Sequence, residues 1–91
     1  MRAGEWYSSG AEGVLGQWRG AEVGVWECEP GTYPDVEADE LFVVLSGDAT
    51  IEFHEPALPA IEIGPGDVVR LEEGMRTVWT VRKTLRKVYV G

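Results

Sequence analysis

The chain contains only one histidine, His54, and only one cysteine, Cys28, among its 91 residues. A single cysteine excludes an intramolecular disulfide and a cysteine-based zinc cage. His54 lies far along the sequence from Cys28, Ser8 and Ser9, so we expect neither a Cys–His nucleophile nor a serine triad. We interpret His54 as a solvated loop residue and Cys28 as a buried, inert thiol.

Long apolar runs and basic residues are also scarce. No stretch approaches the roughly 20 apolar residues of a membrane-spanning helix, and residues 1–6 lack the apolar run of a secretion signal. Eight Lys and Arg against 16 Asp and Glu give a formal net charge of −8. An acidic chain is a poor partner for nucleic acid or an anionic membrane. We therefore expect a cytoplasmic protein that binds neither.

The composition is that of a small globular protein. Hydrophobic residues make up 44% of the chain and include four tryptophans, which argues against disorder. A chain this short buries a modest share of the surface that it exposes when unfolded. We expect one domain over residues 1–91, completed by a second copy in a homodimer.

Short β-branched and aromatic runs, separated by turn residues about every 8 to 12 positions, indicate antiparallel strands in a sandwich or barrel. No helical period competes with them. The expected strands are residues 5–7, 13–18, 22–28, 41–45, 50–53, 60–63, 68–71, 77–81 and 85–90.

Turn chemistry divides these strands. Residues 41–45 (LFVVL) are almost continuously apolar, so we expect a central strand with both faces covered. Residues 46–48 (SGD) predict a tight hairpin turn. The proline-rich residues 54–59 predict a hairpin loop, and residues 64–67 (GPGD) predict another turn.

Two glycine-framed blocks carry the spacing of a known motif pair. Glu40 and Gly47 are separated by six residues, as at the end of the first cupin motif. Gly66 and Gly74 fit the frame of the second motif. The chain thus resembles the cupins, which implies an all-β, antiparallel jelly-roll β-barrel.

The resemblance also implies where a metal would be held. Metal-binding cupins use two histidines and the glutamate of the first motif plus one histidine of the second. Here the first-motif histidines fall on Pro34 and Val36 or, with the longer spacing, on Tyr33 and Asp35. Thr77 stands at the second-motif histidine. One carboxylate cannot hold a transition metal, so we expect no metal and no cofactor.

Further blocks, at residues 24–31, 64–67, 79–81 and 86–89, are similar to the small single-domain cupins related to ureidoglycine aminohydrolase. That resemblance implies ureido or amino-acid-derived substrates, although the missing metal ligands argue against carrying the activity over. The acidic residues 35–40 have two interpretations: an oxygen cluster for calcium or magnesium, or a solvated loop before a buried strand.

Strand alternation predicts which side chains face the interior. Glu40 shares a face with Phe42 and Val44. The other expected inward sets are Thr77, Trp79 and Val81 on one strand and Gly24, Trp26 and Cys28 on another, with Met75 joining and Tyr33 at the rim. Trp26, Tyr33, Phe42, Thr77 and Trp79 are our candidate ligand-binding residues. They either wall a cavity for a small flat or apolar molecule or fill the barrel.

Glu40 is the candidate catalytic residue. A carboxylate inside an apolar barrel favours its protonated form unless a cation compensates, which suits a general acid or base. The alternative is a structural ion pair with Lys87 or Arg76.

Three functions follow from these observations. The first is a metal-free cupin that binds a small organic molecule or serves as a non-catalytic module. The alternative is a metal-independent isomerase, cyclase or hydrolase that uses Glu40, with Tyr33 and Thr77 orienting the substrate. The third is a scaffold with a solid barrel.

Overall fold

The computed structural model describes residues 12–91, which form seven antiparallel strands and no helix. The strands are β1 (Glu12–Trp18), β2 (Ala21–Cys28), β3 (Gly31–Val36), β4 (Glu40–Glu55), β5 (Ala57–Ile63), β6 (Val68–Leu71) and β7 (Arg76–Val90). The strand expected at residues 5–7 lies outside the described part. Over residues 12–91 there is no helix with the length and apolarity that crossing a bilayer requires.

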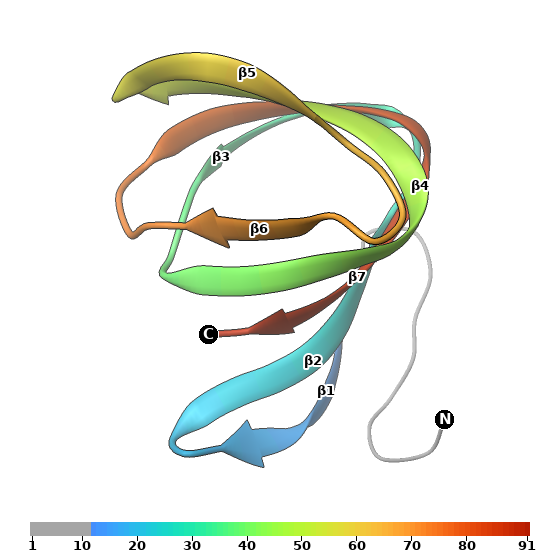
Figure 1. Cartoon of the computed structure of the whole chain (residues 1–91), viewed down its shortest axis with the longest axis vertical. Coiled ribbons are helices and arrows are strands. Elements are labelled where there is room, and N and C mark those ends of the chain that lie inside the picture. Colours follow the sequence, from blue (N-terminus) through green and yellow to red (C-terminus); the bar gives the residue numbers. More distant parts are fainter. Residues whose placement is uncertain (1–11) are drawn as a thin grey trace.

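The two longest strands, β4 and β7, pair with each other and belong to two layers at once (Figure 1). In layer A, the strand order is β1-β2-β7-β4-β6, and in layer B it is β3-β7-β4-β5. The first half of β4 and the second half of β7 lie in layer A, and the remaining halves lie in layer B. The curved layers enclose the core as an antiparallel jelly-roll barrel, which confirms the predicted fold class.

The predicted hairpin turn at residues 46–48 is wrong. The chain continues through these residues as part of β4, with register shifts between Val44 and Ala49 that bend the strand from layer A into layer B. Glycine and small polar residues suit a β-bulge as well as a turn. Gly47 adopts φ +111°, and a Cβ there would lie 2.5 Å from the Thr84 carbonyl oxygen, so the bend requires glycine.

The strands expected at 77–81 and 85–90 are likewise one continuous strand, β7. Its central residues cross between the layers beside the bulges of β4, where Lys83 pairs with Asp48. Arg82 donates to Asp48 at 2.8 Å and to Glu62 at 2.6 Å, which ties this crossing to β5. The eight or nine separate strands expected are therefore seven in the described residues.

Two further predictions, both based on proline residues, are wrong. Most of the expected loop at 54–59 is strand, because β4 and β5 meet in a tight turn at the Glu55–Pro56 bond. No strand was expected around Pro34, yet β3 spans it as an edge strand whose one partner among residues 12–91 is β7. Edge strands tolerate proline because no ladder hydrogen bond is lost on the open side. The turn predicted at 64–67 and the strand at 68–71 are confirmed.

The core contains the side chains that alternation assigned to the interior. Thirteen apolar side chains are buried: Val25, Cys28, Phe42, Val44, Ala49, Ile51, Ile63, Val69, Leu71, Trp79, Val81, Leu85 and Tyr89. All of these except Val25 form one cluster, and Trp26 and Met75 are partly buried and pack against it. The predicted inward orientation of Phe42, Val44, Trp79, Val81 and Cys28 is confirmed.

Only one face of residues 41–45 is covered, contrary to the prediction for a central strand. Phe42 and Val44 point into the core, with 1% of each exposed. Leu41 and Leu45 point outward and remain 46% and 47% exposed.

Candidate functional site

An ion pair lies at the start of β4, on the inner face of layer A. The Lys87 ammonium on β7 donates to Glu40 Oε2 at 2.6 Å. The Lys87 side chain is only 7% exposed, and that of Glu40 is 21% exposed. Of the two alternatives drawn from the sequence for Glu40, the geometry therefore matches the ion pair. Arg76, the other candidate partner, instead lies 3.4 Å from Glu55 at the exposed end of β7.

Three aromatic rings surround the Lys87 ammonium. Nζ lies 4.2 Å from the ring centroid of Phe42, 4.8 Å from that of Trp26 and 5.0 Å from that of Trp79. The rings also contact one another, with centroids 5.9 Å apart for Trp26–Trp79 and 5.7 Å for Phe42–Trp79. Ring faces attract a cation when it is desolvated. We call Trp26, Phe42 and Trp79 the aromatic cage.

A second carboxylate, Glu37, joins the site from the segment between β3 and β4. Thr77 donates its hydroxyl to Glu37 Oε2 at 2.6 Å, and Trp79 donates Nε1–H to the same oxygen at 3.0 Å. Glu37 is buried, so these two donors replace the water that its carboxylate loses. The interpretation of residues 35–40 as a wholly solvated loop is therefore wrong for Glu37.

Backbone hydrogen bonds fix Glu37 in place. Its N–H donates to the Met75 carbonyl at 2.8 Å, and its carbonyl accepts from the Gly74 N–H at 2.8 Å. These bonds tie the segment before β4 to the turn before β7. Strand alternation could not predict that the Glu37 side chain faces the interior, because Glu37 lies outside a strand. Its one feature in the sequence that points to the site is its position three residues before Glu40.

Tyr33 and Cys28 lie together at the turn between β2 and β3. The Tyr33 hydroxyl donates to the Glu29 carbonyl at 2.8 Å, and the Cys28 thiol donates to the same carbonyl at 3.4 Å. Burial raises the pKa of the Cys28 thiol above its ordinary value, and the hydrogen bond with Tyr33 partly offsets this. The pKa of Tyr33 is raised mainly by that same hydrogen bond. The Tyr33 hydroxyl is thus engaged with this turn, and Cys28 has the character of an unreactive thiol.

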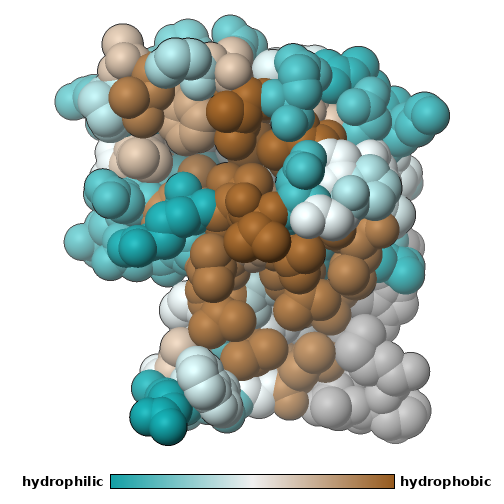
Figure 2. Space-filling view, in the orientation of Figure 1, coloured by the Kyte–Doolittle hydropathy of each residue, from teal (hydrophilic) through white to brown (hydrophobic). Residues whose placement is uncertain are grey.

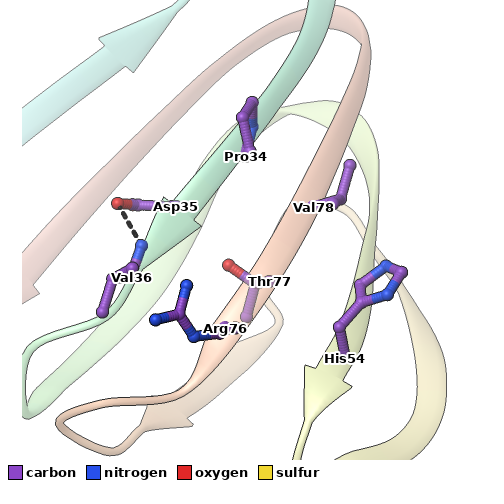
Figure 3. Close-up of a pocket in the computed structure, with 7 residues that line it drawn as sticks. All are labelled: Pro34, Asp35, Val36, His54, Arg76, Thr77 and Val78. Carbon is purple, nitrogen blue, oxygen red and sulfur yellow. Dashed lines mark hydrogen bonds between the residues drawn. The ribbon is translucent and has the colours of Figure 1, made fainter.

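A groove of about 500 Å³ lies between β3, the start of β7 and the end of β4. It is lined by Pro34, Asp35, Val36, His54, Arg76, Thr77 and Val78 (Figure 3). Its polar groups do not converge, because Asp35 accepts from the Val36 N–H at 2.8 Å and His54 lies 3.9 Å from Glu52. His54 is solvent-exposed as predicted, but it lies on β4 and not in a loop. We find no catalytic arrangement in this groove.

The donors at the cupin ligand positions do not fit a transition metal. They are the Glu40 carboxylate and the Thr77 hydroxyl, with a positively charged ammonium beside the carboxylate. Iron, zinc, manganese and nickel sites need several imidazole, thiolate or carboxylate ligands. Within residues 12–91 no three His, Cys, Asp or Glu side chains are grouped to hold an ion, which also leaves the acidic segment without a calcium or magnesium cluster.

Comparison with known proteins agrees with this fold. The model of the EutQ-like cupin domain matches residues 15–89. The chain therefore belongs to the EutQ-like cupin domain family. No curated protein matches the chain.

Several solved structures share the fold. A DUF861 family protein from Thermotoga maritima is 26% identical, with a TM-score of 0.65, over 71% of this chain and 73% of that one. A cupin-2 domain protein from Shewanella frigidimarina is 14% identical, with a TM-score of 0.73, over 94% and 83%. The Clostridium difficile EutQ protein is 20% identical, with a TM-score of 0.66, over 77% of this chain and 54% of that one.

Proposed function

We propose that this chain is a metal-independent cupin module that binds a small organic acid at the Lys87 ammonium. One observation carries the proposal: an ammonium has three N–H donors, and within residues 12–91 Glu40 is the single hydrogen-bond acceptor of Lys87. Ring faces attract the charge but accept hydrogen bonds only weakly. A carboxylate is the acceptor that pairs best with the remaining donors.

The walls around Lys87 favour a flat ligand. Aromatic rings offer stacking surfaces for a planar group, and two of the groups that touch the ammonium are partly accessible. Trp26 is half-buried, and Glu40 keeps 21% of its side chain exposed. A ligand would enter between them and share the ammonium with Glu40.

Residues 24–31, 64–67, 79–81 and 86–89 resemble the small single-domain cupins related to ureidoglycine aminohydrolase, and this resemblance suggests the first compounds to try. Ureido acids combine a planar ureido group with a carboxylate, which match the rings and the ammonium respectively. Calorimetric titration with N-carbamoylglycine, and with its primary amide as a control that lacks the charge, tests the proposal. We expect heat of binding with the acid and none with the amide.

Two variants locate the site. Lys87→Met keeps the apolar stem but removes the charge, and should abolish binding. Glu40→Gln removes the carboxylate that competes for Lys87, and should tighten binding of the acid. Equal binding of acid and amide, or unchanged binding by Lys87→Met, would refute an ammonium-centred site. If no member of a panel of planar organic acids binds, the solid-barrel scaffold is the better description.

An enzyme is the second candidate, because Glu40 bonds Lys87 through Oε2 alone while part of its side chain faces solvent. A metal-independent isomerase, cyclase or hydrolase would use this carboxylate as acid or base, with Thr77 nearby on β7 and Tyr33 at the rim. Proton NMR of ureido acids incubated with the protein distinguishes the two candidates. Turnover that Glu40→Gln abolishes would favour the enzyme, whereas unchanged spectra beside measurable binding would favour the binding module.

A further inference from the structure

The chain has two lysines, Lys83 and Lys87, and the structure places them in opposite surroundings on the same strand. Lys83 is exposed at the crossing of β7, where it pairs with Asp48. The Lys87 side chain is only 7% exposed. Lysines that are held away from water serve in proteins as nucleophiles toward carbonyl groups, because burial opposes the charged form, which cannot attack. Of the two lysines, Lys87 has the surroundings that suit this chemistry.

Layer A is apolar on both of its sides around Lys87. On the inner side the aromatic cage surrounds the ammonium, with the ring centroid of Phe42 4.2 Å from Nζ. On the outer side Val43 pairs with Val88 across β4 and β7. Figure 2 shows a hydrophobic band down the middle of the molecule, where Figure 1 places these strands. Surroundings that hold little water protect a covalent adduct of the amine from hydrolysis.

Glu40 supplies the base that a reaction of Lys87 needs. An ammonium has no free electron pair, so it must lose a proton before it can attack a carbonyl carbon. Lys87 Nζ donates to Glu40 Oε2 at 2.6 Å, and within residues 12–91 this carboxylate is its single hydrogen-bond acceptor. Proton transfer along this bond gives a neutral amine beside a neutral carboxylic acid. Burial opposes the charged form of each group, which lowers the cost of this transfer.

The aromatic cage also suits the product of such a reaction. A protonated imine carries one positive charge, as the ammonium does. The ring faces and the Glu40 carboxylate therefore stabilise the product in the same way as the starting lysine. The neutral amine is needed only between these two cationic states, so the attraction of the cage for a cation does not oppose the overall reaction.

We propose that Lys87 condenses with a small uncharged aldehyde to form a protonated imine, with Glu40 as the acid–base group. Glu40 first accepts a proton from the ammonium. The amine electron pair then forms the C–N bond as the C=O π bond opens, and the carbonyl oxygen takes that proton from Glu40. The nitrogen next returns a proton to Glu40, which passes it to the new hydroxyl as the C–O bond breaks and water leaves. Ammonium and aldehyde thus give iminium and water, and no oxidant or reductant is required.

This activity goes beyond the binding of organic acids proposed above and is separable from it. An aldehyde that lacks a carboxylate does not depend on recognition of an anion. The two proposals also predict opposite effects of one variant, because Glu40→Gln removes the competitor of a bound acid but also removes the base that the condensation needs. Either proposal can therefore fail while the other stands.

Reductive trapping of the wild-type protein tests the condensation. The protein is incubated with propanal and sodium cyanoborohydride at about pH 7, so that any imine is converted to a stable secondary amine, which peptide mass spectrometry locates. Lys83 in the same molecule is the matched control. We expect Lys87 to be alkylated at least about tenfold faster than Lys83, because a positioned acid–base group typically accelerates a reaction by ~10²–10⁴. In urea the two lysines should react at similar rates, since the unfolded chain has neither the cage nor the positioned base.

Glu40→Gln tests the role of the carboxylate. We expect alkylation of Lys87 to slow by about tenfold or more, while the rate at Lys83 stays unchanged. Circular dichroism shows whether the variant is folded, and if it is not, the ratio of the two rates in the wild-type protein still decides. Folded wild-type protein that labels Lys83 as fast as Lys87 would overturn the proposal. A folded Glu40→Gln variant that labels Lys87 at the wild-type rate would overturn the role of Glu40 and with it the mechanism.

Discussion

Lys87 Nζ and Glu40 Oε2 lie 2.6 Å apart although the two residues are 47 positions apart in the sequence. The contact exists because β7 and β4 are neighbours in layer A, where Lys87 pairs with Val44 across the ladder. The motif glutamate that binds metal in other cupins is thus occupied by a cation that the chain supplies itself.

The first prediction concerns the energy of this pair. Lys87→Met should destabilise the protein because it leaves Glu40 partly buried without its cation, and the double variant Lys87→Met/Glu40→Gln should lose less than the sum of the two single changes. We expect a coupling energy of about 1–3 kcal/mol from urea unfolding. The exposed pair Arg76–Glu55, treated in the same way, should give below about 1 kcal/mol. Equal coupling energies in the two cycles would show that burial does not strengthen the Lys87–Glu40 pair.

The second prediction concerns Glu37. Thr77→Val keeps the shape of the side chain but removes the hydroxyl that donates to Glu37 at 2.6 Å. A buried carboxylate that loses a donor should lower the free energy of unfolding by about 1–3 kcal/mol. Thr80→Val, three residues along β7 on the outer face, is the control and should change it by less than about 0.5 kcal/mol. A Thr77→Val variant as stable as Thr80→Val would show that the hydrogen bond from Thr77 to Glu37 does not stabilise the fold.

The third prediction concerns the bend in β4. Gly47 and Gly66 both have positive φ, +111° and +89°, so alanine is strained at either position. At Gly66 the space is open and the cost should be about 1–2 kcal/mol. At Gly47 the new Cβ would also meet the Thr84 carbonyl and Leu85 Cα, which should add about 1–3 kcal/mol. Thermal unfolding of Gly47→Ala and Gly66→Ala, compared directly, checks the order, and a reversed order would contradict the crossing geometry.

The fourth prediction is a pH dependence. Because burial raises the pKa of the Cys28 thiol, a smaller fraction is thiolate at a given pH than for an exposed cysteine, whose pKa is about 8.5. The rate of reaction with a chromogenic disulfide should therefore reach half its maximum at a higher pH than that value in the folded protein. Urea-unfolded protein, with the same single thiol, should react faster and reach its half-maximal rate at about pH 8.5. A folded protein with the unfolded profile would contradict the buried thiol.

Much of the fold could be predicted from local pattern alone. The alternation of apolar side chains identified the inward faces of β2, β4 and β7, and the spacing of Glu40, Gly47, Gly66 and Gly74 identified the cupin framework. The continuity of β4 could not be predicted, because the same Ser-Gly-Asp residues serve a hairpin turn and a strand bulge. Which of the two forms depends on the partner strand, here the crossing segment of β7.

The candidate site was predictable only in part. Trp26, Phe42 and Trp79 were selected by strand parity and do come together in one cluster, which the structure centres on Lys87. Tyr33 was placed at the rim, where its hydroxyl proves to be bonded to the Glu29 carbonyl. Glu37 was missed because its burial depends on contacts with Met75 and Gly74, far away in sequence. A local sequence pattern does not show which remote segments will pair, so it could not predict this contact.

The sharing of β4 and β7 between both layers has a consequence for how the molecule assembles. Neither layer is complete without residues 76–90, since this segment bonds to β2, β3 and β4. During synthesis β1 could pair with β2, and β4 with β5 and β6, but nothing would join these groups to each other or to β3. Closure of the barrel must therefore wait until residues 76–90 have left the ribosome. The barrel should then form, and later come apart, as one cooperative unit.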